Sequence, residues 1–333
     1  MNPFNQPLQI NNTRIDPPLM LAPMAGITHS AFRRLVADFG GYGALCTEML
    51  SATALLAEDL LGSPFTRRRP SEGRVFYQLR LTGEEDIRRV IDKLKTIDPF
   101  GIDINLGCPA PEIRKSGGGQ GLFDNGECLE KVIAGVRKEW LGPLTVKCRL
   151  GRPGNNWQSV FKDRMKLFEE TGVDSITVHP RFSDEKLKRR ARWDLFPWIA
   201  ALSKLPIIVN GDITQPDAAL LLLEKGCCKG LMIGRIAAVK PWIFREFCGE
   251  KLAVDYGEIW TREYGYIMED FKPEKAIGRI KEFSSYFAQN FIYGHQFYKA
   301  VQGAKDLDTL KKRAVEFLKG GPEVEKEPSV MGL

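Results

Sequence analysis

Eight short apolar runs alternate with amphipathic stretches through the first 249 of the 333 residues, and this alternation predicts an α/β fold, an eight-stranded TIM (β/α)8 barrel. Two further observations support the prediction. Polar residues follow several of the apolar runs, as they do where barrel strands end at an active site. No G-x-G-x-x-G follows the first run, which argues against the alternative, a doubly wound open sheet. After residue 250 the strand-like runs stop, and a small all-helical domain is predicted.

The predicted strands are short, apolar and bounded by turn signals. They cover Leu19–Ala22, Ala44–Thr47, Val75–Leu79, Ile102–Asn105, Leu144–Cys148, Ser175–Val178, Ile207–Asn210 and Gly230–Ile233. Amphipathic, helix-like segments lie between them at Ser30–Phe39, Glu84–Ile97, Leu129–Glu139, Val160–Thr171, Trp193–Leu202 and Pro216–Lys225. Eight such steps in about 230 residues are the spacing of a TIM barrel.

The predicted domain boundaries follow these patterns. Residues 1–249 form the barrel, residues 250–319 the helical domain, and residues 320–333 a flexible tail. Within 258–318, apolar side chains such as Ile280, Phe283 and Phe287 recur at helical spacing. The tail begins with the sequence GGPEVEKEP, which is typical of a frayed chain end.

The composition is that of an ordinary soluble globular chain, with 43% hydrophobic and 27% charged residues. The N-terminus lacks the basic start and apolar core of a secretion signal, and no apolar run is long enough to span a bilayer. Seven cysteines without a C-x-x-C pair, together with three histidines, disfavour a zinc site and fit reduced thiols. We therefore expect a cytoplasmic, monomeric protein with no metal and no membrane association.

The charge is unevenly distributed. The net charge is +7 over residues 1–249 and −1 over residues 250–333. An anionic partner is therefore expected to meet mainly the barrel, although a solvated surface could carry the same surplus.

The last two predicted strands are followed by a candidate phosphate site. Asn210, Gly211 and Asp212 follow the seventh strand, and Gly234 and Arg235 follow the eighth. In these barrels, the loops at this place often bind phosphate through glycine N–H groups and a nearby cation. The alternative is a pair of ordinary turns.

Lys147 lies in the middle of the apolar strand VKCRL. A buried lysine needs an anion or a polar ligand. A flavin ring fits this need, since its N1–C2=O edge gains negative charge on reduction. The alternative is a salt bridge inside the barrel, for instance with Glu48.

Cys108 follows the fourth strand and precedes Pro109 in a glycine-rich loop. Cysteine is more often a small buried apolar residue than a catalyst. A thiol is mostly protonated at neutral pH, however, and on an active-face loop it can act as a general acid.

The segment after the sixth strand, RFSDEKLKRRARW, is strongly basic. Such a loop suits a polyanion whose reactive part enters the barrel mouth, and a solvated charged loop is the alternative. The basic residues assigned to substrate or RNA binding are Arg181, Lys186, Lys188, Arg189 and Arg190. Aromatic side chains of the helical domain could stack on RNA bases, but their spacing favours core packing.

Seven motifs, in order between residues 19 and 247, resemble the tRNA-dihydrouridine synthase family. They are PMAGITHSAFR, the lone Gln78, DINLGCP, TVKCRLG, ITVHPR, IVNGDI and MIGR-(x)5-PWIF. The sequence departs from the family pattern at His29, where aspartate is usual, and in the loops after Cys108 and His179. The resemblance implies a flavoenzyme with FMN that reduces uridine to 5,6-dihydrouridine in tRNA, with NADPH as the reductant.

The resemblance also implies residue roles. Cys108 would donate a proton to C5 of the uracil ring after hydride transfer from reduced flavin to C6, and Arg181 would contact substrate or cofactor. The helical domain would be the RNA-binding domain. The flavin would be held by Pro23, Met24, Ala25, Gln78, Lys147 and His179, and its ribityl phosphate by Asn210, Gly211, Asp212, Gly234 and Arg235.

Two other functions stay open at this point. Another FMN barrel acting on a pyrimidine, such as a dihydroorotate dehydrogenase, also carries an N-x-[SG]-C-P loop but has less need of a basic loop and a helical domain. A non-catalytic RNA-binding protein is the second alternative, and the intact Cys108 and Lys147 argue against it.

Overall fold

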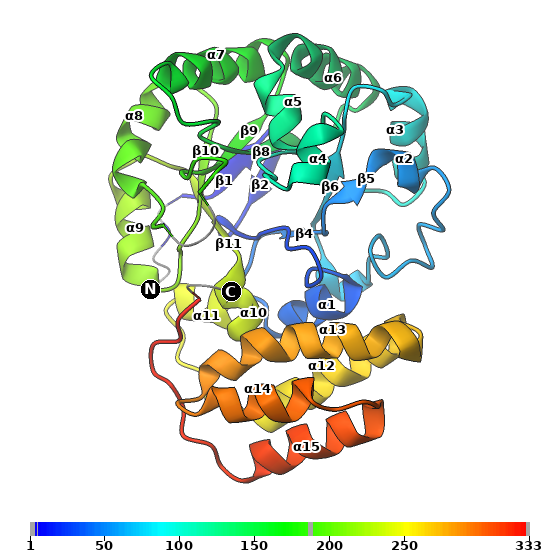
Figure 1. The fold of residues 1–333 in the computed structure, drawn as a ribbon. Coiled ribbons are helices and arrows are strands. Elements are labelled where there is room, and N and C mark those ends of the chain that lie inside the picture. Colours follow the sequence, from blue (N-terminus) through cyan, green and yellow to red (C-terminus); the bar gives the residue numbers. More distant parts are fainter. Residues whose placement is uncertain (1–3, 5, 186–188, 331–333) are drawn as a thin grey trace.

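The computed structural model describes residues 4, 6–185 and 189–330, and it contains a parallel barrel surrounded by helices (Figure 1). The strand order is β3-β11-β10-β9-β8-β7-β6-β4, with neighbouring strands parallel. A parallel bridge between Met20 and Ala44 joins the two ends of this order. The predicted fold class is confirmed.

Each of the eight predicted strands overlaps one strand of the barrel. These are β3 (Leu19–Leu21), β4 (Leu45–Cys46), β6 (Val75–Arg80), β7 (Gly101–Leu106), β8 (Leu144–Arg149), β9 (Ser175–His179), β10 (Ile207–Asn210) and β11 (Gly230–Ile233). Their apolar side chains are buried, which is why the runs were visible in the sequence.

The outer helices also follow the predicted order. They are α1 (Ser30–Phe39), α3 (Ile87–Lys95), α6 (Gly126–Glu139), α7 (Trp157–Glu170), α8 (Phe196–Ala201) and α9 (Pro216–Glu224). Helix α3 begins three residues later than predicted, because the Asp86 carboxylate caps it by accepting from the Arg89 N–H. Helix α8 begins later because residues 193–195 form a turn of 3-10 helix.

Short elements that the sequence did not predict complete the barrel. A hairpin of β1 (Leu8–Ile10) and β2 (Thr13–Ile15) packs its apolar side chains against Met20, Phe76 and Ile208 inside the barrel. The other short elements are β5 (Leu50–Ser51), α2 (Ala52–Leu55), α4 (Pro111–Lys115), α5 (Gln120–Asp124), α10 (Arg235–Val239) and α11 (Ile243–Phe247). They are too short to give a periodic pattern.

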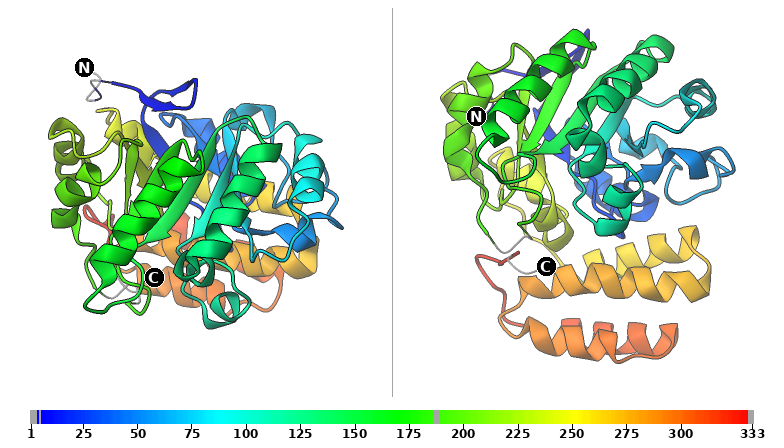
Figure 2. Two further views of the ribbon diagram at one scale, coloured as in Figure 1. Left: turned by 90° about the horizontal axis from the view of Figure 1, so that it is seen from above. Right: turned by 45° about the horizontal axis from the view of Figure 1, so that its top comes forward.

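The last four helices form a layer beside the barrel, as Figure 1 and the right-hand view of Figure 2 show. They are α12 (Tyr256–Asp270), α13 (Pro273–Phe287), α14 (Gly294–Gln302) and α15 (Leu307–Lys319). The aromatic side chains Phe283, Phe287 and Phe291 are buried and pack against one another. These three rings therefore serve the core, as their helical spacing favoured.

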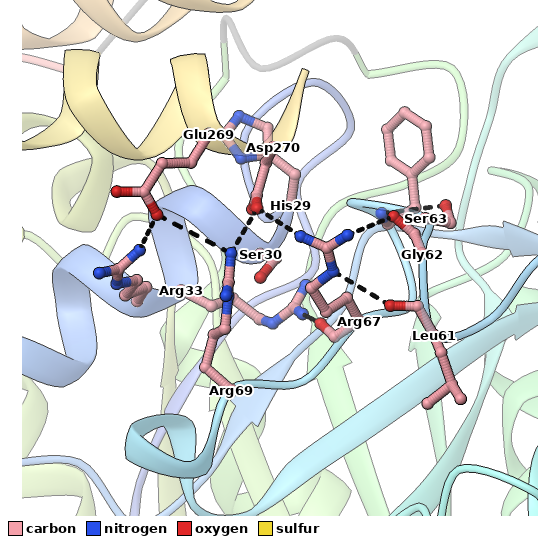
Figure 3. A network of polar contacts seen from close by, with 12 residues as sticks. His29, Ser30, Arg33, Leu61, Gly62, Ser63, Arg67, Arg69, Glu269 and Asp270 are labelled. Carbon is pink, nitrogen blue, oxygen red and sulfur yellow. Dashed lines mark hydrogen bonds and ion pairs between the residues drawn. The ribbon is translucent and has the colours of Figure 1, made fainter. Parts of the chain in front are cut away.

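Ion pairs fix the helical layer to the barrel. The Asp270 carboxylate at the end of α12 accepts from Arg67 at 2.9 Å and from Arg69 at 2.7 Å, as Figure 3 shows. Beneath this contact the fully buried Arg33 pairs with Glu72 at 2.6 Å and donates to the Arg67 carbonyl. Because Asp270 is itself almost completely buried, its charge depends on both arginines.

His29 begins α1 at the same junction, and Figure 3 shows it near Ser30. Its Nδ1 accepts from the Phe32 N–H at 3.3 Å, so the imidazole caps the helix. Burial lowers the pKa of His29 well below its ordinary value, and the charges of Arg279 and Arg33 lower it further. The cap of α1 is therefore a neutral side chain.

The tail returns to the barrel. From α15 it runs back toward α10 in Figure 1, and Val324 forms an antiparallel bridge with Phe291. The Val330 carbonyl accepts from Arg235 at 2.6 Å. Val324 and Val330 thus make specific contacts with Phe291 and Arg235, and the flexibility expected of residues 320–333 stays a prediction.

Among the described residues, the helices are too short or too polar for any to cross a membrane.

Candidate active site

A pocket of about 160 Å³ opens among the loops that follow β3, β8, β9, β10 and β11. These loops lie at the carboxyl ends of the strands, where TIM barrels place their functional groups. Nine of the predicted site residues line it: Pro23, Met24, Lys147, His179, Asn210, Gly211, Asp212, Gly234 and Arg235. The structure therefore brings together residues up to 212 positions apart in the chain.

Strand register explains this convergence. Lys147 is paired with Thr177, and Arg149 with His179, across β8 and β9. Side chains two positions apart on a strand share a face, so Lys147 and Arg149 both point toward the pocket. Arg149 thus joins the site.

Lys147 is a buried cation whose charge the nearby Asp103 carboxylate favours without forming an ion pair with it. No described residue accepts a hydrogen bond or forms an ion pair with its ammonium group. Burial lowers the pKa of Lys147 to about 8, and the charge of Arg149 adds to this effect. Glu48, the alternative partner, instead accepts the Gly26 N–H at 2.8 Å. An anionic ligand would supply the missing partner.

His179 is a neutral hydrogen-bonding group. Burial lowers its pKa well below the ordinary value, and the charges of Lys147, Arg149, Arg181 and Arg235 act in the same direction. Its Nε2 lies 2.7 Å from Nη1 of Arg181. A guanidinium can only donate, so Nε2 accepts and the ring proton is on Nδ1.

Asp212 organises two of the arginines. Its carboxylate accepts from Arg181 at 2.5 Å and from Arg235 at 3.1 Å, and also from the Ala191 N–H at 2.7 Å. Arg181 is only 1% exposed, so it lies behind the pocket and supports His179 and Asp212. The predicted contact of Arg181 with substrate or cofactor stays a prediction.

The residues that line the pocket include three cations, Lys147, Arg149 and Arg235, and one carboxylate, Asp212, so the lining carries a surplus of positive charge. It can therefore hold a phosphate-bearing, anionic cofactor. Burial lowers the pKa of Arg149 and of Arg235, which shows that their charges are only partly solvated.

Gly211 permits the loop after β10 to lie close to His179 at the end of β9. Its φ is +103°, and a Cβ built on it would lie 2.5 Å from Cδ2 of His179. The Gly211 carbonyl also accepts from the indole of Trp193 at 2.8 Å. Only glycine fits between the imidazole and this loop.

Replacing Gly211 with alanine should lower the free energy of unfolding by about 2–4 kcal/mol, since backbone strain and a steric clash add together. Gly226→Ala is the matched control, because Gly226 also has a positive φ of 70° but no atom within 4 Å of its Cβ position. Urea unfolding of both variants measures the difference. An equal loss of unfolding free energy in the two variants would show that the contact with His179 does not require glycine at position 211.

Cys108 follows β7, beside the strand β8 that carries Lys147 and Arg149 of the pocket. It is a free, half-buried thiol, and its backbone N–H donates to Oδ1 of Asn105 at 3.0 Å. The preceding Gly107 lies against β8, where its Cβ position is 3.3 Å from the Arg149 nitrogen. The thiol is thus next to the cationic pocket without being one of its lining groups.

Two residues predicted to contact the flavin, Ala25 and Gln78, are not among those that line this pocket, and their contact with the flavin stays a prediction. Ala25 is exposed and does not line the pocket. Gln78 is only 1% exposed, and its amide binds Asp103 and Asn105 inside the barrel. These positions make Gln78 a support of neighbouring side chains.

The basic loop is described only in part. Lys186 and Lys188 lie outside the described residues. Arg189 and Arg190 are exposed, whereas Arg192 pairs with Glu185 at 2.5 Å.

The sequence reasoning missed Asp103 and did not assign Arg149. Both are charged residues within apolar strands, which is the signal that identified Lys147. Burial raises the pKa of Asp103, while hydrogen bonds from Thr145 and Gln78 and the charge of Lys147 oppose the rise.

Solved structures with a similar fold include a 2-naphthoyl-CoA reductase, at a TM-score of 0.56 and 13% identity over 74% of this chain and 52% of that protein. An old yellow enzyme homologue from Zymomonas mobilis aligns at a TM-score of 0.55 and 14% identity, over 78% of this chain and 96% of that one. At these identities, the similarity concerns the barrel fold alone.

Curated relatives match most of the chain. A probable tRNA-dihydrouridine synthase of Rickettsia conorii is 28% identical over 96% of this chain and 98% of its own length. The tRNA-dihydrouridine(16) synthase of Cupriavidus necator is 28% identical over 91% and 97%. The tRNA-dihydrouridine synthase B of Vibrio parahaemolyticus is 31% identical over 72% and 73%.

The family model described as dihydrouridine synthase (Dus) matches residues 20–317, which include both the barrel and the helical layer. The match confirms the resemblance carried by the seven motifs: this chain belongs to the dihydrouridine synthase family.

Proposed function

We propose that this protein reduces uridine to 5,6-dihydrouridine in tRNA, using bound FMN that is reduced by NADPH. The names of its relatives support the substrate. The observation that carries the proposal is the cationic pocket with the unpaired Lys147, adjacent to the loop of Cys108.

The pocket residues fit FMN on three grounds. No described carboxylate forms an ion pair with Lys147, Gly211 leaves room where a Cβ would collide with His179, and Arg235 brings a cation to the loop after β11. We assign the ring edge to Lys147 and His179. The phosphate is assigned to the loops after β10 and β11, with Asp212 holding Arg235 in place.

When bound and reduced, the flavin supplies a hydride to C6 of the uracil ring. The Cys108 thiol donates its proton to C5 from the opposite face, which completes the saturation of the C5–C6 bond. The Lys147 ammonium favours negative charge on the flavin ring edge, and neutral His179 adds a hydrogen-bonding group without adding charge.

Binding of tRNA is assigned to two regions. A uridine within folded RNA must leave its stack to reach the barrel mouth, so the protein has to hold the surrounding RNA. We propose that residues 1–249 form the catalytic domain and residues 250–319 the RNA-binding domain. Tyr293 and Tyr298, which are 56% and 46% exposed on the helical layer, are available for stacking.

The function is tested by mass-spectrometric mapping of dihydrouridine in RNA from a strain that lacks the gene, with and without its restoration. We expect at least one tRNA dihydrouridine to disappear and to return on restoration. The purified protein should be yellow and release FMN on denaturation. Unchanged dihydrouridine, or a protein that does not bind FMN, would contradict the proposal.

Replacing Lys186, Lys188, Arg189 and Arg190 with alanine should weaken tRNA binding and reduce the slope of log K against log salt by about 0.7–0.9 for each phosphate that the loop no longer neutralises. The control variant replaces four exposed lysines of α6 and α7: Lys131, Lys138, Lys162 and Lys166. Fluorescence titrations at several salt concentrations give both quantities. If the two variants behave alike, the loop is solvated surface.

A further inference from the structure

We propose that Asp103 is a positioning residue: through Gln78 and Asn105 it fixes the orientation of the loop that carries Cys108. The proposal rests on the proposed function for the role of Cys108, but the orientation of the loop can be measured without catalysis.

A continuous chain of hydrogen bonds leads from Asp103 to the loop. Asp103 on β7 is 1% exposed, and its Oδ2 accepts from Nε2 of Gln78 at 2.7 Å. Oε1 of Gln78 accepts from Nδ2 of Asn105 at 2.8 Å. Oδ1 of Asn105 then accepts the backbone N–H groups of Cys108 at 3.0 Å and of Gly107 at 3.3 Å.

The chain has a direction because each amide has one donating and one accepting end. Asp103 presents an oxygen to Gln78, so the NH₂ group of Gln78 must face it and the carbonyl must face Asn105. The NH₂ group of Asn105 is therefore turned toward Gln78, which leaves its carbonyl for the loop. If both amides were reversed, an NH₂ group would face the Cys108 and Gly107 N–H groups, and the loop would lose its acceptor.

Thr145 fixes the other end of the chain. Its hydroxyl donates to Oδ1 of Asp103 at 2.6 Å, and Thr145 is 2% exposed. A hydroxyl can also accept, so an asparagine at position 103 could donate its NH₂ group to Thr145 and still present its carbonyl to Gln78. Without the hydroxyl, the NH₂ group of this asparagine would have no acceptor at position 145, and the reversed orientation would become accessible.

The alternative is that Asp103 acts by its negative charge near Lys147. The two explanations differ for Asp103→Asn, which removes the charge but keeps an acceptor for Gln78. They also differ for Asp103→Asn combined with Thr145→Val, which changes no further charge but removes the group that orients the new amide.

We expect Asp103→Asn and Thr145→Val each to retain most of the turnover of tRNA at saturating substrate. The double variant should lose about 100-fold in kcat, the cost of misplacing a reacting group by about 1 Å. FMN affinity should be the same in Asp103→Asn and in the double variant, because both lack the same carboxylate beside Lys147. Asp103→Leu should resemble the double variant.

The rate of alkylation of Cys108 by iodoacetamide, followed by mass spectrometry of its peptide, reports the loop directly. It should change in the double variant and stay near the wild-type rate in both single variants, with thermal unfolding used to verify that each variant is folded. A single Asp103→Asn variant as impaired as the double variant, or an unchanged alkylation rate in the double variant, overturns the proposal. A wild-type protein that forms no dihydrouridine overturns the proposed function alone, since the alkylation test still applies.

Discussion

Replacing Cys108 with alanine should lower dihydrouridine formation on unmodified tRNA by about 100-fold or more while FMN stays bound, the usual range for the loss of a general acid. The thiol is half-buried and is held by backbone contacts to Asn105 and Gln120. Since the flavin is assigned to other residues, its binding should not depend on the sulfur.

Single-turnover kinetics with prereduced enzyme separate this effect from flavin reduction. Reduction by NADPH should be unchanged in Cys108→Ala, and only the transfer to uridine should slow. Cys128→Ala is a suitable control, because Cys128 is another free, half-buried thiol, and it lies on α6. Wild-type turnover in Cys108→Ala would remove the proton donor from the proposed mechanism.

Replacing Lys147 with methionine should weaken FMN binding by at least about tenfold and also stabilise the flavin-free protein by about 1–3 kcal/mol at pH 7. The two effects share one cause. Burial lowers the pKa of Lys147 from 10.5 to about 8, so the folded protein binds the lysine proton less tightly than the unfolded chain does. At pH 7 the lysine is protonated in both states, and burying its charge lowers the free energy of unfolding.

The pH dependence follows from the same shift. Between pH 8 and 10.5 the unfolded chain retains the lysine proton while the folded protein releases it, so the contribution of Lys147 makes the flavin-free protein more stable as pH rises. Lys147→Met should lack this gain. Urea unfolding of both proteins at pH 7, 8 and 9.5 measures it.

Lys147→Arg is the control for charge, because arginine remains protonated throughout this range. FMN affinity should fall above pH 8 in the wild type more steeply than in Lys147→Arg. Equal free energies of unfolding for the wild type and Lys147→Met at pH 7 would show that the buried ammonium group does not destabilise the flavin-free protein. The inference that Lys147 needs an anionic ligand would then be wrong.

Local patterns were sufficient for much of the fold. Strands such as β8 and β10 were identifiable because buried, helix-covered strands are runs of apolar residues. The polar residues after them, including Lys147 and Asn210, stood out because burial of a polar group needs a reason. The β1–β2 hairpin was not identifiable, because three-residue strands carry no periodicity.

The sequence by itself therefore determined the barrel, the helical segment that follows it and the residues that gather at the carboxyl ends of the strands. Only the tertiary structure decided that Arg181 is buried against Asp212, that Asp103 is joined to the Cys108 loop through two amides, and that Val330 contacts Arg235. The physical reason is that buried positions and turns favour particular residue types, so both can be identified from a short stretch of sequence. The partner of a charge or an amide is chosen by strand register and packing between distant segments, which no local pattern encodes.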